Sequence, residues 1–340
     1  MQAQEAEDTA TPQNAQGSTG AATADSQISV DTEMRGGGTF TATKEIYTFE
    51  AVAKYVYGYP GEYMETLQQA NPGIDSGRVI AGKTVFQLPK MLVVKDITFP
   101  SATYDDKQPF TVPYGQKTFD AEGQEGGPYH SREPDVPSES SGVTIGRGYD
   151  MKYRDAQTIY DQLTAAGIPD SVALIYKGAA EKSGQTGVES ALTWLNSKQE
   201  GAGEQTNREA VGEITKEQQW NLFIQEYQRQ TDGVIRSIVR QELEKDENGQ
   251  WKCRVDFENL NPKILELLID MDYRGDLKGE WKGDFRQSVI ENDLSSIQSF
   301  VKDHAEWRKD IYERYKARCN IVGVEPKAKT EAEAKPSDGK

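Results

Sequence analysis

The segment from Phe119 to Met151 constrains the fold and function of this chain more than any other part. It gathers acidic residues between glycines and reads FDAEGQEGGPYHSREPDVPSESSGVTIGRGYDM. Its hydrophobic residues show too little periodicity for a long helix or strand. A folded chain has little structural use for carboxylates beside glycine-rich turns unless those turns bring the carboxylates to a ligand. The sequence therefore predicts that this segment forms the active site.

The end of this segment, GVTIGRGYD at residues 142–150, predicts a hairpin. Val-Thr-Ile is a short β-branched run that favours a strand, and the flanking glycines permit tight turns and close backbone approach. We therefore expect Thr144 to lie on the hairpin. Asp150 follows where the pattern becomes helical, so it either caps that helix or points back toward Thr144.

Two strings of residues resemble known glycoside hydrolases. The Glu-Gly, Tyr and Thr-Ile-Gly-x-Gly pattern of phage-type lysozymes is matched here by Glu122-Gly123, Tyr129 and Thr144-Ile145-Gly146-Arg147-Gly148. The longer string YHSREPDVPSESSGVTIGRGYDMK is similar to the lysozyme-like domain of pesticin and related bacterial toxins. The resemblance covers roughly residues 105–322. It implies an α+β domain with a cleft between a small β-hairpin lobe and a mainly helical lobe.

The second carboxylate differs between the two branches of this resemblance. Phage-type enzymes carry an aspartate two residues after the tyrosine, where this chain has Ser131. The pesticin-like branch has an aspartate after the TIGxGY string, which is Asp150 here. The resemblance thus implies Glu122 as the general acid, Asp150 as the base and Thr144 as the residue that holds the attacking water. Glycoside hydrolysis needs such a pair, with one carboxyl group protonated and the other ionised.

The neighbours of these carboxylates suggest how the site is tuned. The pKa of Glu122 rises only if the group is partly buried, and Phe119, Tyr129 and Tyr149 are available to bury it. We expect Tyr129, Arg147 and Tyr149 to contact the substrate. Arg147 either holds the base in its ionised form or lies in solvent.

Three other glutamates in the segment compete for the role of acid: Glu125, Glu133 and Glu139. Each is interpreted as a surface loop residue. Glu133 is the strongest rival, because it adjoins Arg132 and lies inside the string that is most similar to the pesticin-like domain.

Residues 39–90 predict a separate small module. A strand, two helices and a closing strand give the order βααβ, with breaks at Tyr59-Pro60-Gly61 and Asn71-Pro72-Gly73. This order resembles a LysM module, whose signature is matched by Ala70-Asn71-Pro72-Gly73, Ile80-Ala81-Gly82 and Leu88-Pro89. The resemblance implies binding to N-acetylglucosamine polymers such as peptidoglycan or chitin, or docking in phage and contractile tails. The opening strand departs from the family pattern, with Thr43-Lys44-Glu45-Ile46-Tyr47-Thr48 in its place.

Composition divides the rest of the chain. Residues 1–38 and 323–340 lack a core-forming pattern and predict disordered tails. Residues 91–118 contain strand-like stretches at Met91–Ile97 and Phe110–Pro113 and predict a linker that packs on the second domain, 119–322. Beyond the hairpin we expect helices over residues 155–166, 169–182, 187–196, 215–243 with a break near Asp232-Gly233, 262–272, 283–291, 294–304 and 307–319.

Charge and residue usage exclude several classes of function. The formal charge of −16 argues against a nucleic-acid partner. There is no run of eighteen apolar residues, so we expect no membrane span. Cys253, Cys319, His130 and His304 have no metal-ligand spacing, and we therefore predict no metal and no other cofactor. The start MQAQEAEDTATPQNAQG has neither the basic nor the apolar part of a secretory signal, which favours synthesis in the cytoplasm and non-classical delivery to the cell wall or periplasm.

These features predict an α+β peptidoglycan hydrolase. We expect a muramidase that cleaves the β-1,4 bond between N-acetylmuramic acid and N-acetylglucosamine, with peptidoglycan as partner and delivery by a phage-like or contractile injection tail as one route. Two alternatives from other classes remain open. One is a structural tail or baseplate component docked by the LysM-like module to tail proteins. The other is a wall-binding protein without catalysis.

Overall fold

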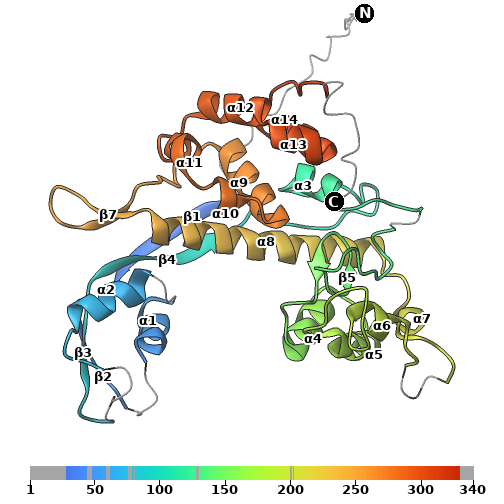
Figure 1. Ribbon diagram of the computed structural model, residues 1–340, viewed down its shortest axis with the longest axis horizontal. Helices are drawn as coiled ribbons and strands as arrows, with labels where there is room; N and C mark the ends of the chain where they lie inside the picture. The colour runs from blue at the N-terminus through green and yellow to red at the C-terminus, as the bar shows by residue number, and fades with distance from the viewer. Residues whose placement is uncertain are drawn as a thin grey trace, which may run out of the picture.

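The computed structural model describes residues 28–43, 48–58, 62–75, 79, 81–127, 130–199, 201 and 203–329. Within these residues, helices occur together with two-stranded antiparallel sheets, which confirms the predicted α+β class. The elements gather around one long helix, α8, which runs through the middle of the molecule (Figure 1). No helix in this part of the chain is both long and apolar enough to cross a membrane. Residues 1–27 of the predicted N-terminal tail lie outside the described residues.

Helix α8 (Lys216–Gln241) supports the elements on both of its sides. It begins at a capping box, in which the side chain of Thr215 accepts from the backbone of Gln218 and the side chain of Gln218 binds back to Thr215. We predicted a break near Gly233, but the helix continues through this position. A helical glycine costs about 1 kcal/mol relative to alanine. Burial of Val234 and its neighbours on the inner face outweighs that cost.

The N-terminal module has the predicted order βααβ, formed by β2 (Gly38–Thr41), α1 (Phe49–Tyr57), α2 (Glu62–Ala70) and β3 (Val85–Leu88). β2 and β3 pair antiparallel, with Phe40 opposite Phe86. Asn71 is buried after α2 and accepts from the N–H of Gln87 at 2.6 Å. Its Nδ2 donates to the carbonyls of Leu67 (2.7 Å) and Gln87 (2.8 Å). Asn71 thus ties the end of α2 to β3, which explains the asparagine of the Asn-Pro-Gly break.

A long ribbon joins this module to the rest of the protein. Strand β1 (Ser29–Arg35) pairs antiparallel with β4 (Met91–Thr98), so the predicted disordered tail was wrong for the β1 residues. Only Val30 of β1 is buried. The polar sequence of β1 gave no strand signal, because this strand is stabilised by backbone pairing with the apolar β4 rather than by apolar side chains of its own. Adjacent residues of a strand face opposite sides. Val93 of β4 therefore enters the core of the module, while Val94 enters the core beside α8.

The predicted linker over residues 91–118 packs on α8, as expected. Arg236 of α8 donates to the carbonyl of Val94 at 2.8 Å. The second expected strand, at Phe110–Pro113, is wrong, because these residues are irregular. The side chain of Gln116 accepts from the N–H of Val112 (2.9 Å) and donates to the carbonyl of Phe110 (3.0 Å), which closes a turn there instead. Helix α3 (Gln116–Ala121) begins at the same residue.

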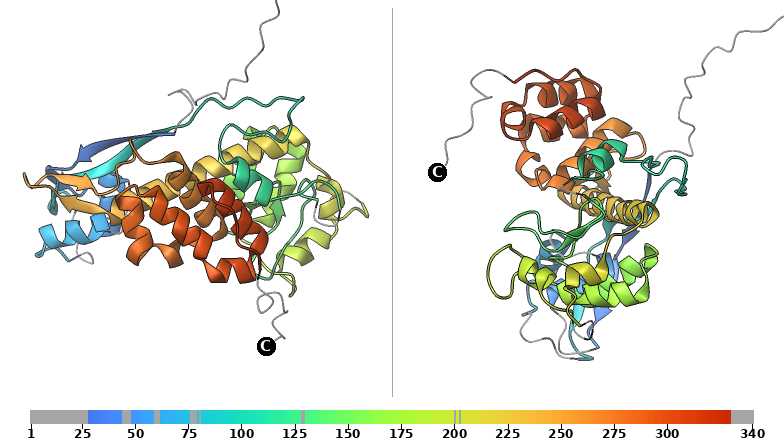
Figure 2. Two further views of the ribbon diagram at one scale, coloured as in Figure 1. Left: turned by 90° about the horizontal axis from the view of Figure 1, so that it is seen from above. Right: turned by 90° about the vertical axis from the view of Figure 1, so that its right-hand side faces the viewer.

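Two groups of elements flank α8 on opposite sides (Figure 2). The hairpin lobe contains β5 (Thr144–Ile145), β6 (Tyr149–Asp150), α4 (Ala156–Ala165), α5 (Asp170–Tyr176), the 3-10 helix η3 (Lys177–Ala179), α6 (Ala191–Asn196) and α7 (Asn207–Val211). The helical lobe contains α9 (Pro262–Arg274), α10 (Leu277–Glu280), α11 (Gly283–Ile290), α12 (Leu294–Asp303), α13 (Ala305–Asp310) and α14 (Tyr312–Val322). Leu222 of α8 enters the core of the hairpin lobe, and Phe223 enters the core of the helical lobe. The helix therefore separates the two lobes and holds both.

The C-terminal half differs from the prediction in several elements, among them the short helices α7 and α10, which we did not predict. The helix expected over residues 307–319 is divided into α13 and α14, because Ile311 leaves the helical conformation with φ −134° and ψ 53°. A hairpin of β7 (Leu243–Lys245) and β8 (Trp251–Cys253), which we did not predict, follows α8. Leu243 and Trp251 pack against the core of the N-terminal module, so this hairpin connects the module to the helical lobe.

The predicted C-terminal tail is partly ordered against the helical lobe. The N–H of Lys327 donates to the hydroxyl of Tyr315 at 2.9 Å, and its Nζ pairs with Asp303 at 2.6 Å. Val324 packs against the core. The prediction of a solvated tail was therefore wrong for residues 323–329, and residues 330–340 lie outside the described part of the chain.

Candidate active site

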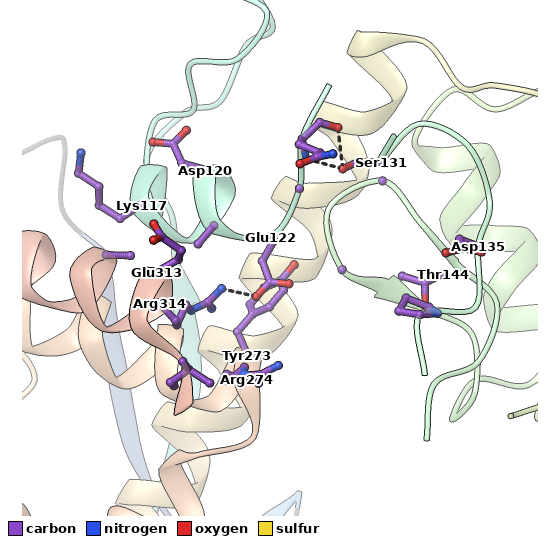
Figure 3. A pocket seen from close by; sticks show the side chains of 18 of the residues that line it. Lys117, Asp120, Glu122, Ser131, Asp135, Thr144, Tyr273, Arg274, Glu313 and Arg314 are labelled. Atoms are coloured by element: carbon purple, nitrogen blue, oxygen red, sulfur yellow. Dashed lines mark hydrogen bonds and ion pairs between the residues drawn. The ribbon is translucent and has the colours of Figure 1, made fainter. Parts of the chain in front are cut away.

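A cleft of about 1220 Å³ lies between the hairpin lobe and the helical lobe. Its helical wall includes Lys117, Glu122, Tyr273, Arg274, Arg314 and Lys316. The opposite wall includes His130, Ser131, Glu133, Asp135, Thr144 and Gly148. Figure 3 shows the two walls facing each other, with Glu122 on one side and Thr144 and Asp135 on the other. The structure thus brings three of the four predicted catalytic residues, Glu122, Thr144 and Glu133, to one cleft.

Glu122 is the C-cap residue of α3, and its side chain is 19% exposed. Nη1 of Arg314 donates to its Oε1 at 2.6 Å. Burial raises the pKa of Glu122 above its ordinary value, and the nearby negative charge of Asp270 acts in the same direction. Arg314 and Arg274 oppose this rise. A raised pKa is the direction that suits a general acid.

Arg147 has a different role from the predicted one. It is buried and does not line the cleft, and its Nη1 donates to the carbonyls of Phe119 (2.5 Å) and Gly123 (2.9 Å). Its Nε donates to Gln219 at 2.6 Å, and its guanidinium lies over the ring of Phe119. The two carbonyls flank Glu122 in the sequence. Arg147 therefore connects the hairpin turn to the backbone on either side of Glu122 and holds that backbone in place. These contacts explain the arginine without any contact to substrate or to Asp150.

Gly148 shows why the turn needs a glycine. Its φ is +89°, a left-handed conformation that residues with a side chain rarely adopt. A Cβ atom there would lie 2.6 Å from Cε1 of Tyr273 and 3.4 Å from Oε2 of Glu122. The hydroxyl of Tyr273 donates to the carbonyl of Arg147 at 2.9 Å. The turn therefore presses its backbone directly against the helical lobe beside the acid.

Ser131 stands where phage-type enzymes carry an aspartate, and it closes the loop that follows Glu122. Its Oγ accepts from the N–H of Gln124 at 2.8 Å and donates to the carbonyl of the same residue at 3.1 Å. A Cβ atom at Gly123 would collide with this hydroxyl. The glycine after the acid is therefore a packing requirement. Tyr129, a predicted substrate contact in the same loop, lies outside the described residues.

The predicted hairpin is confirmed, with Thr144 opposite Asp150 in its register. On its other side, Thr144 pairs with Asp135. The N–H of Asp135 donates to the carbonyl of Thr144 at 2.9 Å, and the N–H of Thr144 donates back at 2.8 Å. Asp135 lines the cleft with 47% of its side chain exposed, and Arg208 lies 3.5 Å from its Oδ1. Sequence reasoning missed Asp135, although the two prolines of Pro134-Asp-Val-Pro137 favour an extended segment that is able to pair beside the hairpin.

Asp150 is not among the residues that line the cleft. Its carboxylate accepts from the N–H of Gly142 at 3.0 and 3.1 Å and from the N–H of Lys152 at 2.8 Å. It does not cap the following helix, since Asp155 has that role. The structure therefore places Asp150 next to Thr144 in the ladder, with its oxygens bound to backbone amides.

The remaining predicted residues lie at the rim or in the core. Glu133 is exposed on the cleft wall, whereas Glu122 is mostly buried. Tyr149 is buried, does not line the cleft, and donates to Gln162 at 2.8 Å, so the structure does not place this predicted substrate contact at the site. Glu125 pairs with Arg132 at 2.9 Å. Among the described residues no three histidine, cysteine, aspartate or glutamate side chains gather as a metal site.

The arrangement has the chemical groups for acid–base hydrolysis. One carboxyl group is buried and has a raised pKa, whereas the carboxylate of Asp135 is half-exposed and close to an arginine. Thr144 lines the same wall beside Asp135, and its hydroxyl donates to the carbonyl of Gly142 at 3.3 Å. A bond held between the walls would thus face a proton donor on one side and a carboxylate with a hydroxyl on the other.

Comparison with known proteins gives one family. A family model described as Domain of unknown function (DUF8812) matches residues 115–319. The match begins one residue before α3, ends within α14 and contains Glu122, Asp135, Thr144 and Arg314. No curated protein matches the chain.

Proposed function

This chain belongs to the family described as Domain of unknown function (DUF8812), and we propose that it is a peptidoglycan hydrolase of the muramidase type. The proposed substrate bond is the β-1,4 linkage between N-acetylmuramic acid and N-acetylglucosamine. The proposal joins the resemblance of the Thr144–Asp150 string to lysozyme-like domains with the geometry of the cleft. It places the reaction in the domain that the family model covers.

The observation that carries the proposal is the position of Glu122 relative to Thr144. Glu122 ends α3, which is bound to the helical lobe, Thr144 belongs to the hairpin lobe, and both line the same cleft. Glu122 is mostly buried and its pKa is raised, so it is suited to donate a proton to the leaving oxygen of a glycoside. A cleft of about 1220 Å³ has room for several sugar units of a polysaccharide.

The second carboxylate of the proposed mechanism is Asp135. It lines the wall opposite Glu122 beside Thr144, its side chain is 47% exposed, and its Oδ1 lies 3.5 Å from Arg208. Asp150, the residue that the pesticin resemblance implies, is the competing assignment. Its carboxylate already accepts hydrogen bonds from two backbone amides, so a role in catalysis requires a rearrangement of the turn. In both assignments the hydroxyl oxygen of Thr144 orients the attacking water by accepting from it, while the hydroxyl proton is donated to the carbonyl of Gly142.

The N-terminal module has the βααβ order of a LysM module, and we propose that it brings the catalytic cleft to its target. Its partner is wall glycan or a tail protein. The β1–β4 ribbon and the β7–β8 hairpin both pack against its core. The module is therefore held at a fixed position relative to the cleft, as suits an enzyme that acts on a polymer bound at a second point.

The proposal is tested by incubating the purified protein with purified peptidoglycan sacculi. Release of soluble glycan fragments by the parent, and its loss in Glu122→Gln, supports the hydrolase assignment. Sedimentation of the chain with sacculi without release of fragments would instead indicate a wall-binding protein. Co-purification with tail particles and no activity on sacculi would indicate a structural tail component.

A further inference from the structure

A buried cluster of charged residues lies directly behind Glu122. Asp270 on α9 is fully buried, and it binds Arg314 at both Nε (3.2 Å) and Nη2 (2.8 Å). The same carboxylate binds Nε of Arg318 at 2.8 Å, and Nη2 of Arg318 binds Asp276 at 2.6 Å. Arg314 therefore has two of its three nitrogens on Asp270, and Nη1 is left for Glu122. Such bidentate pairing fixes the plane of the guanidinium group.

The formal charges of this cluster balance without Glu122. Arg314 and Arg318 carry two positive charges, and Asp270 and Asp276 carry two negative charges. An ionised Glu122 would add an uncompensated negative charge at a mostly buried position, which is costly. A protonated Glu122 leaves the cluster neutral. The charge balance of these four paired residues therefore favours the protonated form of Glu122, against the effect of Arg314, which contacts it directly, and of the nearby Arg274.

We propose that Asp270 is a positioning residue for the acid: it orients Arg314 toward Glu122 and offsets the positive charge that would otherwise draw the proton away. The catalytic meaning of this inference rests on the proposed function, whereas the charge balance is a property of the fold. Thr118 strengthens the arrangement, because its Oγ1 donates to Asp270 at 3.2 Å. This bond ties α3, which carries the acid, to α9.

Each element packed against Glu122 contributes a group that bears on this inference. Arg314 of α14 and Arg274 of α9 favour the ionised carboxylate, and Asp270 of α9 favours the proton. Tyr273 of α9 also faces the acid, and burial raises the pKa of its hydroxyl well above the ordinary value, so it stays neutral. The hairpin turn contributes the uncharged Gly148. Among Arg314, Arg274 and Asp270, Asp270 is the one whose charge favours the protonated form of Glu122.

The test is a direct titration of the Glu122 carboxyl group in the parent, in Asp270→Asn and in Arg318→Gln. In each case the infrared spectrum is compared with that of the same protein carrying Glu122→Gln in addition, so that the difference reports the Glu122 carboxyl group alone. In Asp270→Asn the titration should move to lower pH than in the parent. In Arg318→Gln it should move to higher pH, because this change removes the opposite charge from the same cluster. The alkaline limb of kcat/KM on peptidoglycan should move with each titration. At neutral pH, Asp270→Asn should lose on the order of tenfold in kcat/KM, a loss that disappears as the pH is lowered.

Opposite shifts of the Glu122 titration in the two variants would show that charge balance sets it. If Asp270 and Arg318 had only a structural role, the titration would move in the same direction in both variants or in neither. Because both changes break a buried ion pair, the melting curve of each is recorded first. If Asp270→Asn does not fold, Asp276→Asn replaces it, since that carboxylate is 29% exposed at the outer end of the cluster and should give a smaller shift of the same sign. A titration that is unchanged in the folded variants overturns the inference. If the parent cleaves no peptidoglycan at any pH, the proposed function fails, while the titration still decides the charge balance.

Discussion

Nη1 of Arg314 donates a hydrogen bond of 2.6 Å to Oε1 of Glu122, across 192 residues of sequence. The bond joins α14 to the end of α3 and directs the carboxyl group along the wall of the cleft. An arginine in such contact favours the ionised carboxylate, whereas burial favours the acid. The net effect is a raised pKa of Glu122, and burial is its largest cause. The proposed chemistry depends on this group keeping its proton.

Replacement of Glu122 tests the assignment of the acid. Glu122→Gln should fold and lose on the order of a hundredfold or more in the clearing of sacculi, because it removes the proton donor while keeping the shape. Glu133→Gln is the matched control, since Glu133 lines the same cleft but is exposed. It should stay within about threefold of the parent. An inactive Glu133→Gln beside an active Glu122→Gln would exchange the two roles.

The second carboxylate is tested with Asp135→Asn and Asp150→Asn. Asp135→Asn should lose on the order of a hundredfold or more in activity at an unchanged melting temperature, because its half-exposed side chain lines the cleft and supports little of the fold. Asp150→Asn should mainly lower the melting temperature, because it weakens the bonds to Gly142 and Lys152. Thermal melts and initial rates on sacculi separate the two effects. A folded but inactive Asp150→Asn with an active Asp135→Asn would return the role to Asp150.

Activity and stability should both depend on pH through Glu122. The reaction needs the protonated acid, so activity should fall as the pH rises through the raised pKa of Glu122. The folded pKa lies above the ordinary value of 4.5. The folded state therefore binds this proton more tightly than the unfolded chain does, and the resulting stability is present below 4.5 and is lost as the pH rises through the raised pKa.

Glu122→Gln removes this dependence. The Tm of Glu122→Gln minus the Tm of the parent should therefore increase from about pH 4 to about pH 7, measured in one buffer series. A difference in Tm that stays constant, or that falls with pH, would show that the folded state does not hold the proton more tightly.

A pair of glycine substitutions tests how closely the hairpin packs on the helical lobe. Gly148→Ala should lower the free energy of unfolding by about 2–4 kcal/mol, because it combines a left-handed φ with a collision against Tyr273. Gly233→Ala should raise it by about 1 kcal/mol, because this glycine lies within α8 with open space around its Cα. Denaturant unfolding measures both. Similar effects of the two substitutions would mean that the turn does not press on the lobe.

Local signals account for most of what the sequence revealed. The glycines around Thr144 specify the hairpin, and Asn71-Pro72-Gly73 specifies the end of α2, because both act through backbone conformations of a few residues. Strand β1 escaped prediction because its stability comes from pairing with β4, far along the chain, rather than from its own apolar residues. The continuous α8 was missed because the burial of its inner face overrides one glycine.

The site shows a similar division. The position of Glu122 follows from its glycine neighbour and from the resemblance, and the structure places it in the cleft. The direction of Arg147 and the pairing of Asp135 with Thr144 depend on contacts between segments, which no local pattern records. The partnership of Glu122 with Arg314 was missed for the same reason, since the two residues meet only after the helical lobe has folded.

The identity of the bond that is broken tests the proposed function most directly. Purified peptidoglycan is digested with the parent chain and with Glu122→Gln, and the fragments are reduced and separated. The parent should create new reducing ends that belong to N-acetylmuramic acid, and Glu122→Gln should create almost none. New reducing ends on N-acetylglucosamine, or released amino groups with intact glycan strands, would contradict the assignment as a muramidase.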